Sequence, residues 1–292
     1  MNSIITTEHI DAYCLSLLAD EHSAGTISKY RRDLTAFARW LDGRAVTKES
    51  ATAWKACLLN RDYAPRTINS MLAAVNGFCR FAGLPIKLKF LSIQRQIFRD
   101  SAKELTKEEY DRLLTAARES GQERLALIME TLCATGIRVS ELRYITMEAA
   151  LAGRATITLK GKIRTILLPA KLCRKLVKYA KKQKTASGEI FLTKSGRPIT
   201  RRQVWYELKR LCKAAGVEAS KVFPHNLRHL FATTFYRASR DIVRLADMLG
   251  HSSIDTTRIY LMVSGAEQQR QLDRLGLIPL FAARSGSLGA NR

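Results

Sequence analysis

Acidic side chains are scarce in this chain of 292 residues, where 26 Asp and Glu stand against 49 Lys and Arg for a formal net charge of +23. Residues 1–100 carry a net charge of +5 and the remainder carries +18. An excess of this size predicts attraction to a polyanion, and nucleic acid is the commonest one. The basic residues lie within periodic segments and not in a tail, which favours a folded DNA-binding surface over a merely solvated basic one.

Several other features are missing, and each absence excludes a class of protein. The N-terminus lacks the charged and apolar blocks of a signal peptide, and no apolar run approaches the roughly 20 residues that a membrane-spanning helix needs. The six cysteines form no CxxC pair and no metal-type spacing, so a reducing cytoplasm is the expected location and no metal site is predicted. They are Cys14, Cys57, Cys79, Cys133, Cys173 and Cys212.

Helical periodicity dominates residues 1–84. Apolar residues recur at helical spacing in four segments, of which the third begins after Thr47 and the fourth opens at Pro65. Gly83 is a stop signal for the last of them. Four helices of this length predict a small helical bundle as the N-terminal domain.

Residues 85–103 have no clear period and alternate basic with apolar side chains. We expect an interdomain linker there, either following a phosphate backbone or forming an ordinary basic loop. A second domain is expected over 104–276, opened by a capping box between Thr106 and Glu109. The remaining residues, 277–292, are expected to form a tail.

The second domain is predicted to be mainly helical with a small β-sheet. Two short strands are expected at 155–159 and 165–168, forming a hairpin. A further strand is possible at 190–192. Beyond the helices that follow the capping box up to residue 142, helices are expected at 170–183, 200–214, 225–238, 240–249 and 254–263.

Three short motifs carry chemistry in this second domain. The segment ATGIRVSEL contains Arg138, the segment HNLR contains His225 and Arg228, and the segment LGH ends at His251 and is followed nine residues later by Tyr260. In this order, the set resembles the active site of the tyrosine recombinase (phage integrase) superfamily. The resemblance extends from about residue 105 to 275, and the helical N-terminal part is similar to the core-binding domain of that family.

The resemblance implies both an architecture and an activity. Members of the family close around duplex DNA as a C-shaped clamp made of a helical domain and a mixed α/β catalytic domain. The implied activity is site-specific recombination, in which DNA strands are cut and rejoined through a covalent 3′-phosphotyrosine and a Holliday junction, for integration, excision or resolution. Homotetramers on two DNA sites are implied, and neither a metal nor another cofactor is needed.

The two arginines suit the transition state of phosphodiester cleavage, in which negative charge grows on the non-bridging oxygens. A guanidinium stays protonated and binds two oxygens with its planar fork, so Arg138 and Arg228 are the candidates for this role. Arg138 follows a predicted helix break at Thr135 and Gly136, and Glu141 lies three residues further on the same face. A surface pair of Arg and Glu on an amphipathic helix is the structural alternative.

The remaining members of the set are two histidines and a tyrosine. His225 lies three residues before Arg228, so both can face one phosphate, and its ring can donate a hydrogen bond or accept a proton near neutral pH. Tyr260 is the candidate nucleophile, with a core residue as the alternative. His251 is expected to orient the phosphate or assist proton transfer, whereas His229 is expected to be structural and to point elsewhere.

A lysine is the expected general acid for the leaving deoxyribose oxygen. The predicted hairpin offers Lys160 and Lys162. Lys160 fits the resemblance better, because the catalytic lysine of many family members precedes a glycine at this point. Lys162 remains open as the alternative, and a phosphate contact is the lesser role for either.

Further DNA contacts are implied for the helical domain, mostly to phosphates. They are Lys29, Arg31, Arg32, Arg66 and Arg80, although a solvated helix face predicts the same charges. The apolar tail residues Leu277, Ile278, Leu280 and Phe281 are implied either to dock on a neighbouring protomer or to pack on their own domain.

Two other functions use similar sequence features. A type IB topoisomerase would relax supercoils without pairing two sites, and the separate helical domain counts against it. A non-catalytic DNA-binding regulator would keep the fold, but the complete set of catalytic side chains counts against that reading.

Overall fold

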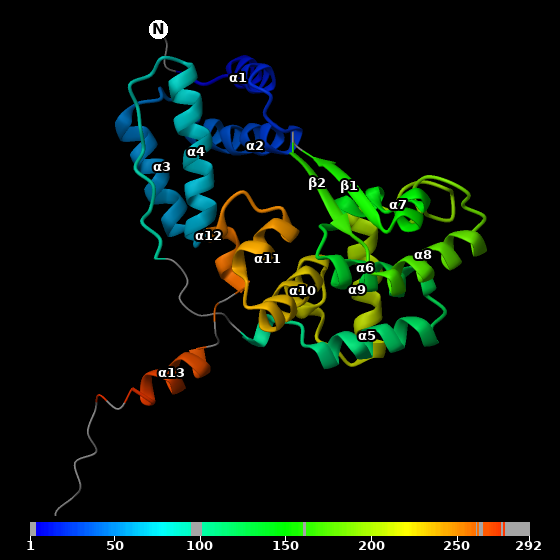
Figure 1. The fold of residues 1–292 in the computed structure, drawn as a ribbon. Coiled ribbons are helices and arrows are strands. Elements are labelled where there is room, and N and C mark those ends of the chain that lie inside the picture. The colour runs from blue at the N-terminus through cyan, green and yellow to red at the C-terminus, as the bar shows by residue number, and fades with distance from the viewer. Residues whose placement is uncertain are drawn as a thin grey trace, which may run out of the picture. The chain divides into compact units, whose positions relative to one another are not determined.

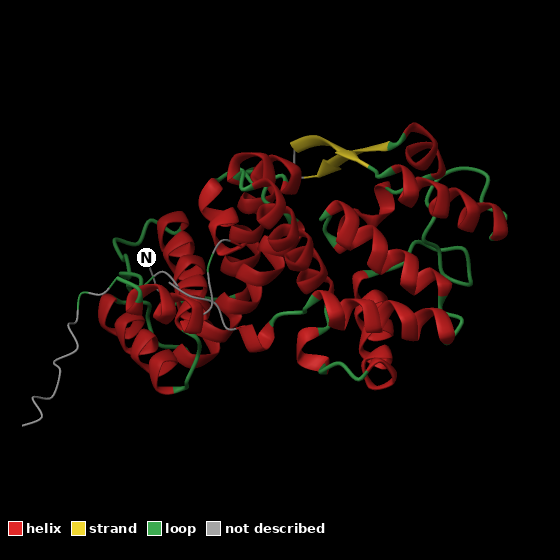
Figure 2. Ribbon diagram, turned by 60° about the horizontal axis from the view of Figure 1, so that its bottom comes forward, coloured by secondary structure: helices red, strands yellow, loops and turns green. Residues whose placement is uncertain are grey.

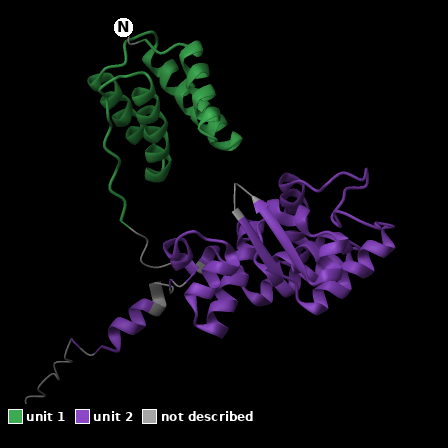
Figure 3. Ribbon diagram, turned by 45° about the horizontal axis from the view of Figure 1, so that its top comes forward, with its two compact units in different colours: residues 1–95 green, residues 96–292 purple. Residues whose placement is uncertain are grey.

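The computed structural model describes residues 4–94, 101–159, 162–260, 262, 265–275 and 277. It divides into two compact units, residues 1–95 and 96–292 (Figure 3). The helices of the first unit are α1 (Thr7–Ala19), α2 (Ala24–Leu41), α3 (Lys48–Asn60) and α4 (Pro65–Phe81).

The first unit is a helical bundle, as its periodicity predicted (Figure 1). Thr6, Ser23 and Thr47 accept hydrogen bonds from the first turns of α1, α2 and α3, which satisfies backbone donors that a helix leaves unpaired. The apolar faces meet in one buried core, in which the rings of Phe37 and Trp54 lie 4.7 Å apart.

The segment that follows α4 is held against that helix by two asparagines. The Asn76 side chain donates to the Leu88 carbonyl at 2.9 Å and accepts from the Leu88 amide at 2.8 Å. Asn69, two turns earlier, makes the same pair of bonds with Leu91 at 2.9 and 2.7 Å. The first part of the predicted linker, up to Leu91, therefore belongs structurally to the bundle.

The second unit is larger and also mainly helical (Figure 2). Its elements are η1 (Ser101–Lys103), α5 (Lys107–Glu119), α6 (Glu123–Thr135), η2 (Val139–Tyr144), α7 (Met147–Ala152), β1 (Arg154–Leu159), β2 (Lys162–Leu167), α8 (Ala170–Lys182), α9 (Arg201–Ala215), η3 (Ala219–Lys221), α10 (Pro224–Ser239), α11 (Ile242–Leu249), α12 (Ile254–Thr257), η4 (Arg258–Tyr260) and α13 (Gly265–Asp273).

Helix α6 forms the centre of this unit, packing against α5, α8, α9 and α10. Its residues Ile128, Met129 and Leu132 are fully buried in the larger core. The predicted capping box between Thr106 and Glu109 is present at the start of α5. The packing around α6 thereby fixes where the C-terminal end of α6 and the N-terminal end of α10 lie.

Strands β1 and β2 pair antiparallel, with Ile157 opposite Arg164 and Leu159 opposite Lys162. An isolated two-stranded hairpin is only marginally stable in water. Here the buried side chains Ala155, Ile157 and Ile166 attach the hairpin to the core, and β1 contacts α7 and η2.

The fold class is confirmed, but individual elements differ from the expectations. The strand expected at 190–192 was wrong: Leu192 makes only an isolated bridge, because its partner segment is a turn ending at Pro198. The helix expected over 254–263 is split into α12 and η4, and α7 was not anticipated. The hairpin strands are each longer than expected.

Candidate active site

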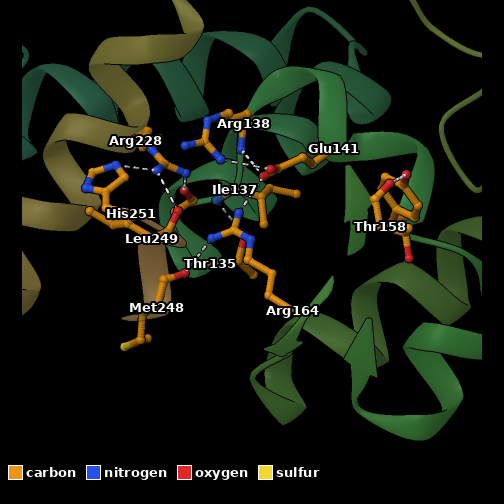
Figure 4. A network of polar contacts seen from close by, with 12 residues as sticks. Thr135, Ile137, Arg138, Glu141, Thr158, Arg164, Arg228, Met248, Leu249 and His251 are labelled. Atoms are coloured by element: carbon orange, nitrogen blue, oxygen red, sulfur yellow. Dashed lines mark hydrogen bonds and ion pairs between the residues drawn. The ribbon is translucent and has the colours of Figure 1, made fainter. Parts of the chain in front are cut away.

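Arg228 lies at the base of the site and is only 2% exposed. Its Nη1 donates to the carbonyl of Gly136, and its Nη2 donates to the carbonyl of Leu249 at 2.8 Å (Figure 4). These carbonyls come from the end of α6, which is distant from α10 in sequence, and from the end of α11, the next helix after α10. The guanidinium is therefore held from three elements at once.

The ends of α6 and α11 are built alike. Each helix stops at a glycine in the left-handed region, Gly136 with φ of 64° and Gly250 with φ of 64°. A helix C-terminus carries partial negative charge, which stabilises a cation placed against it. Burial and the nearby Arg138 lower the pKa of Arg228 to about 10, and the group stays protonated at neutral pH.

Arg138 occupies the N-cap of η2, directly after the α6 break, as its sequence context predicted. Its amide donates to the Glu141 carboxylate at 2.7 Å and its Nη1 donates to the same carboxylate at 3.1 Å. Glu141 is buried, whereas the Arg138 side chain is 42% exposed. One edge of this guanidinium is thus fixed while the rest faces solvent.

Glu141 also binds Arg164, which connects the hairpin to the site. Arg164 Nη2 lies 2.7 Å from the Glu141 carboxylate, and its Nη1 donates to the Met248 carbonyl at 2.9 Å (Figure 4). A Cβ on Gly250 would lie 2.6 Å from Arg164 Cδ and Nη1, so only glycine leaves room for this arginine. The glycine of the LGH motif therefore has a packing role as well as a conformational one.

His251 contacts Arg228 on one side and Thr257 on the other. Its Nε2 lies 3.0 Å from Arg228 Nη2, and its Nδ1 lies 2.9 Å from the Thr257 hydroxyl. A guanidinium can only donate, so Nε2 accepts and the proton resides on Nδ1. Burial and the positive charges of Arg228 and Arg138 lower the pKa of His251 to about 4, so the ring is neutral at physiological pH.

His225 lies at the start of α10, with its side chain reaching the surface. Its surroundings still lower its pKa, through partial desolvation first and then through the charges of Arg228 and Arg138. The neutral ring is the favoured form at neutral pH. It can accept a proton at the open edge of the cluster.

Tyr260 belongs to η4 and is 3% exposed. Burial lowers the pKa of Arg228, and its interaction with the Tyr260 side chain acts in the opposite direction and raises it. Its ring stacks near His251, with ring centroids 6.2 Å apart, and meets the His229 ring edge-on at 5.0 Å. The nucleophile candidate therefore lies within the cation cluster of its own chain.

Five of the six predicted catalytic residues thus come together, from α10, η2, η4 and the loop after α11. They are Arg138, His225, Arg228, His251 and Tyr260. Lys160 lies outside the described residues. For Lys162, which pairs with Leu159 in the hairpin, the backbone alone is described.

Sequence reasoning missed three side chains that support the site. His229 does not point elsewhere, because it packs against Tyr260. Arg164 and Thr257 hold Glu141 and His251, respectively. An arginine directly before a predicted strand and a histidine next to the HNLR motif were available signals, but neither reveals its partner.

The predicted DNA contacts of the first unit lie on α2 and α4 with exposed or half-buried side chains. Arg31 forms an ion pair with Asp11, and Lys29 forms one with Asp33. Arg66 and Arg80 are exposed on α4. A phosphate would compete with the two acidic partners on α1 and α2.

Within the described part of the chain, no group of three or more His, Cys, Asp or Glu is placed to hold a metal ion. None of the described helices is long and apolar enough to cross a membrane.

Comparison with known proteins identifies the family of the chain. Residues 103–267 match the phage integrase family, and residues 10–83 match the phage integrase N-terminal SAM-like domain. The chain belongs to the phage integrase family of tyrosine recombinases. It is thus an enzyme with a two-domain architecture.

Individual relatives span nearly the whole chain. Tyrosine recombinase XerA of Pyrococcus furiosus is 29% identical over 94% of this chain and 96% of its own length. Tyrosine recombinase XerC of Roseiflexus castenholzii is 32% identical over 87% of this chain and 88% of its own length. A lambda integrase tetramer bound to a Holliday junction shares the fold, with a TM-score of 0.71 and 20% identity over 89% of this chain and 78% of that one.

Replacing Gly250 by Ala is expected to destabilise the second unit by roughly 3 kcal/mol, because the new Cβ displaces Arg164 from the buried Glu141. Gly216→Ala is the matched control: it has φ of 59° and open space around a Cβ, so only the backbone strain of about 1 kcal/mol remains. Urea unfolding of both variants gives the comparison. Equal losses would show that Arg164 needs no space at this glycine.

Acid sensitivity should follow from the neutral His251. The unfolded chain takes up this proton near pH 6.5 and the folded chain only near pH 4, so the stabilisation is complete above pH 6.5 and is lost as the pH falls. Between pH 7.5 and 5.5, His251→Gln should lose about 1 kcal/mol less stability than the parent protein. Urea unfolding across this range measures the difference. The exposed His22→Gln is the control, and parallel pH profiles for parent and His251→Gln would contradict the assignment.

Proposed function

We propose that this tyrosine recombinase cuts and rejoins specific sites in double-stranded DNA through a covalent bond between Tyr260 and the 3′ phosphate. The observation that carries the proposal is the packing of the Tyr260 ring beside His251, whose Nε2 in turn lies 3.0 Å from Arg228. Because these residues belong to one chain, we propose that cleavage occurs in cis.

The arginines bind the scissile phosphate in this mechanism. Arg138 offers its exposed guanidinium edge, and Arg228 contributes its positive charge beside Tyr260 to a non-bridging oxygen. Both guanidiniums are held by protein partners before the phosphate arrives, so little reorganisation accompanies charge development. The Tyr260 phenol, beside Arg228, then attacks the phosphorus.

Proton transfers complete the reaction. His225 accepts the phenol proton, since its lowered pKa keeps the ring neutral beside Arg228. His251 is fixed by Thr257 and Arg228 and orients the phosphate. A hairpin lysine, Lys160 in our proposal, protonates the departing 5′ oxygen. Reversal of these steps with the 5′ hydroxyl of another strand rejoins the DNA.

The remaining proposals concern assembly on DNA. We propose that segments 1–84 and 104–276 close around one duplex, with the basic residues of α2 and α4 on its phosphates, and that four copies exchange strands at a Holliday junction. The apolar residues after Gly276 would dock on a neighbouring copy. We expect this to take place in the cytoplasm, where the cysteines, free in all six described positions, remain reduced.

Tyr260→Phe should abolish the covalent adduct with a nicked duplex that carries the recombination site, while leaving DNA affinity within about twofold, because only the nucleophilic oxygen is removed. Tyr206→Phe, exposed on α9, is the matched control and should form the adduct at the parent rate. Denaturing gel electrophoresis of the protein–DNA adduct measures both. An undiminished adduct in Tyr260→Phe would remove this tyrosine from the mechanism.

The two hairpin lysines can be separated with a leaving group that needs no proton. Lys160→Met should slow cleavage of normal DNA by about 100-fold, since a general acid contributes at least that much. With sulfur in place of the bridging 5′ oxygen, the same variant should cleave at the parent rate. Lys162→Met serves as the matched control, and its cleavage rate relative to the parent should be the same on both substrates. The reverse pattern would transfer the role to Lys162.

A further inference from the structure

Tyr260 lies in a stretch with little intrinsic structure. Helix α12 has four residues and η4 has three, and 3₁₀ turns of this length have weak hydrogen-bond geometry. The direction of the phenol must therefore be set by side chains that pack against it from other elements. The contacts of its ring identify them.

Two histidine rings contact Tyr260. His251 stacks on it with an interplanar angle of 12° and is itself fixed by Arg228 and Thr257. His229 meets it edge-on, with centroids 5.0 Å apart and an angle of 62°, a preferred geometry for aromatic pairs. The mechanism proposed above assigns a role to His251 but none to His229.

The carboxylate of Glu104 lies next to His229, with its Oε1 3.8 Å from Nε2 of the ring. Glu104 is fixed on both sides along the chain. The carbonyl of Lys103 accepts a hydrogen bond from the Asn226 side chain at 2.8 Å, and Leu105 is buried in the core. The segment that carries Glu104 is therefore anchored to α10, and it places the Glu104 carboxylate next to that helix.

We propose that Glu104 and His229 form a positioning pair that holds the Tyr260 ring in its direction of attack. The pair touches neither the phosphate nor the leaving group, and it acts only through the phenol. This inference rests on the proposed role of Tyr260 as the nucleophile.

The test is the single-turnover rate of adduct formation at saturating nicked DNA. His229→Ala should lower this rate by about 10- to 100-fold, the cost of a misplaced reacting group, with DNA affinity unchanged. His229→Phe, which keeps a ring edge against Tyr260, should recover most of the loss. Glu104→Gln should slow the parent protein but have no further effect in the His229→Phe background, because the carboxylate acts through the imidazole.

Lys221→Gln is the matched control. It breaks the ion pair with Glu109, 2.8 Å long and similarly half-buried, near the same end of α10 but away from Tyr260. Its rate should equal that of the parent even if its thermal stability falls. Thermal unfolding of every variant separates loss of fold from loss of positioning.

Three results would overturn the inference: a His229→Ala rate no lower than that of Lys221→Gln, a His229→Phe rate as low as that of His229→Ala, or additive effects of the Glu104 and His229 substitutions. If the parent protein makes the Tyr260 adduct, any of these results refutes only the positioning pair and leaves the proposed function unchanged. A parent protein that makes no such adduct would instead refute the proposed function itself.

Discussion

The Arg228 guanidinium is buried where the C-terminal ends of two helices converge, and the rest of the site is arranged around it. An isolated buried cation is strongly unfavourable, and the carbonyls of Gly136 and Leu249 offset that cost with hydrogen bonds and with the partial negative charge of their helices. Both helices must therefore stop at fixed points. The glycine ends of α6 and α11 follow from this requirement, since a Cβ on Gly136 would also lie 2.3 Å from Phe231.

The second arginine is fixed by a different device. Arg138 starts a new turn directly after the α6 break, and Glu141 restrains it while also binding Arg164 from the hairpin. The buried carboxylate thus balances two guanidiniums and links α6, η2 and β2. The same positive charges lower the pKa of His251 and keep it neutral. The same cluster of positive charges therefore accounts both for the fixed guanidiniums and for the uncharged imidazole.

Local sequence patterns predicted the structural features that depend on residues close together in the sequence. Periodic apolar residues gave the bundle, the capping box at Thr106 is present, and the glycine break before Arg138 begins a turn as expected. What could not be predicted depends on partners distant in sequence. Arg164 meets Met248 across 84 positions, and the His229 contact with Tyr260 requires the path of the chain after α11. Periodicity places a side chain on a face of its element but does not identify what covers that face.

The asparagine contacts on α4 have a consequence for how the two units cooperate. Backbone atoms are fastened at Leu91 by Asn69 and at Lys103 by Asn226, so the two anchored points are separated by on the order of ten residues of chain. If both units bind one duplex, as proposed above, engagement by the second unit is an intramolecular event, so that weak binding by each unit alone adds up to tight binding by the protein.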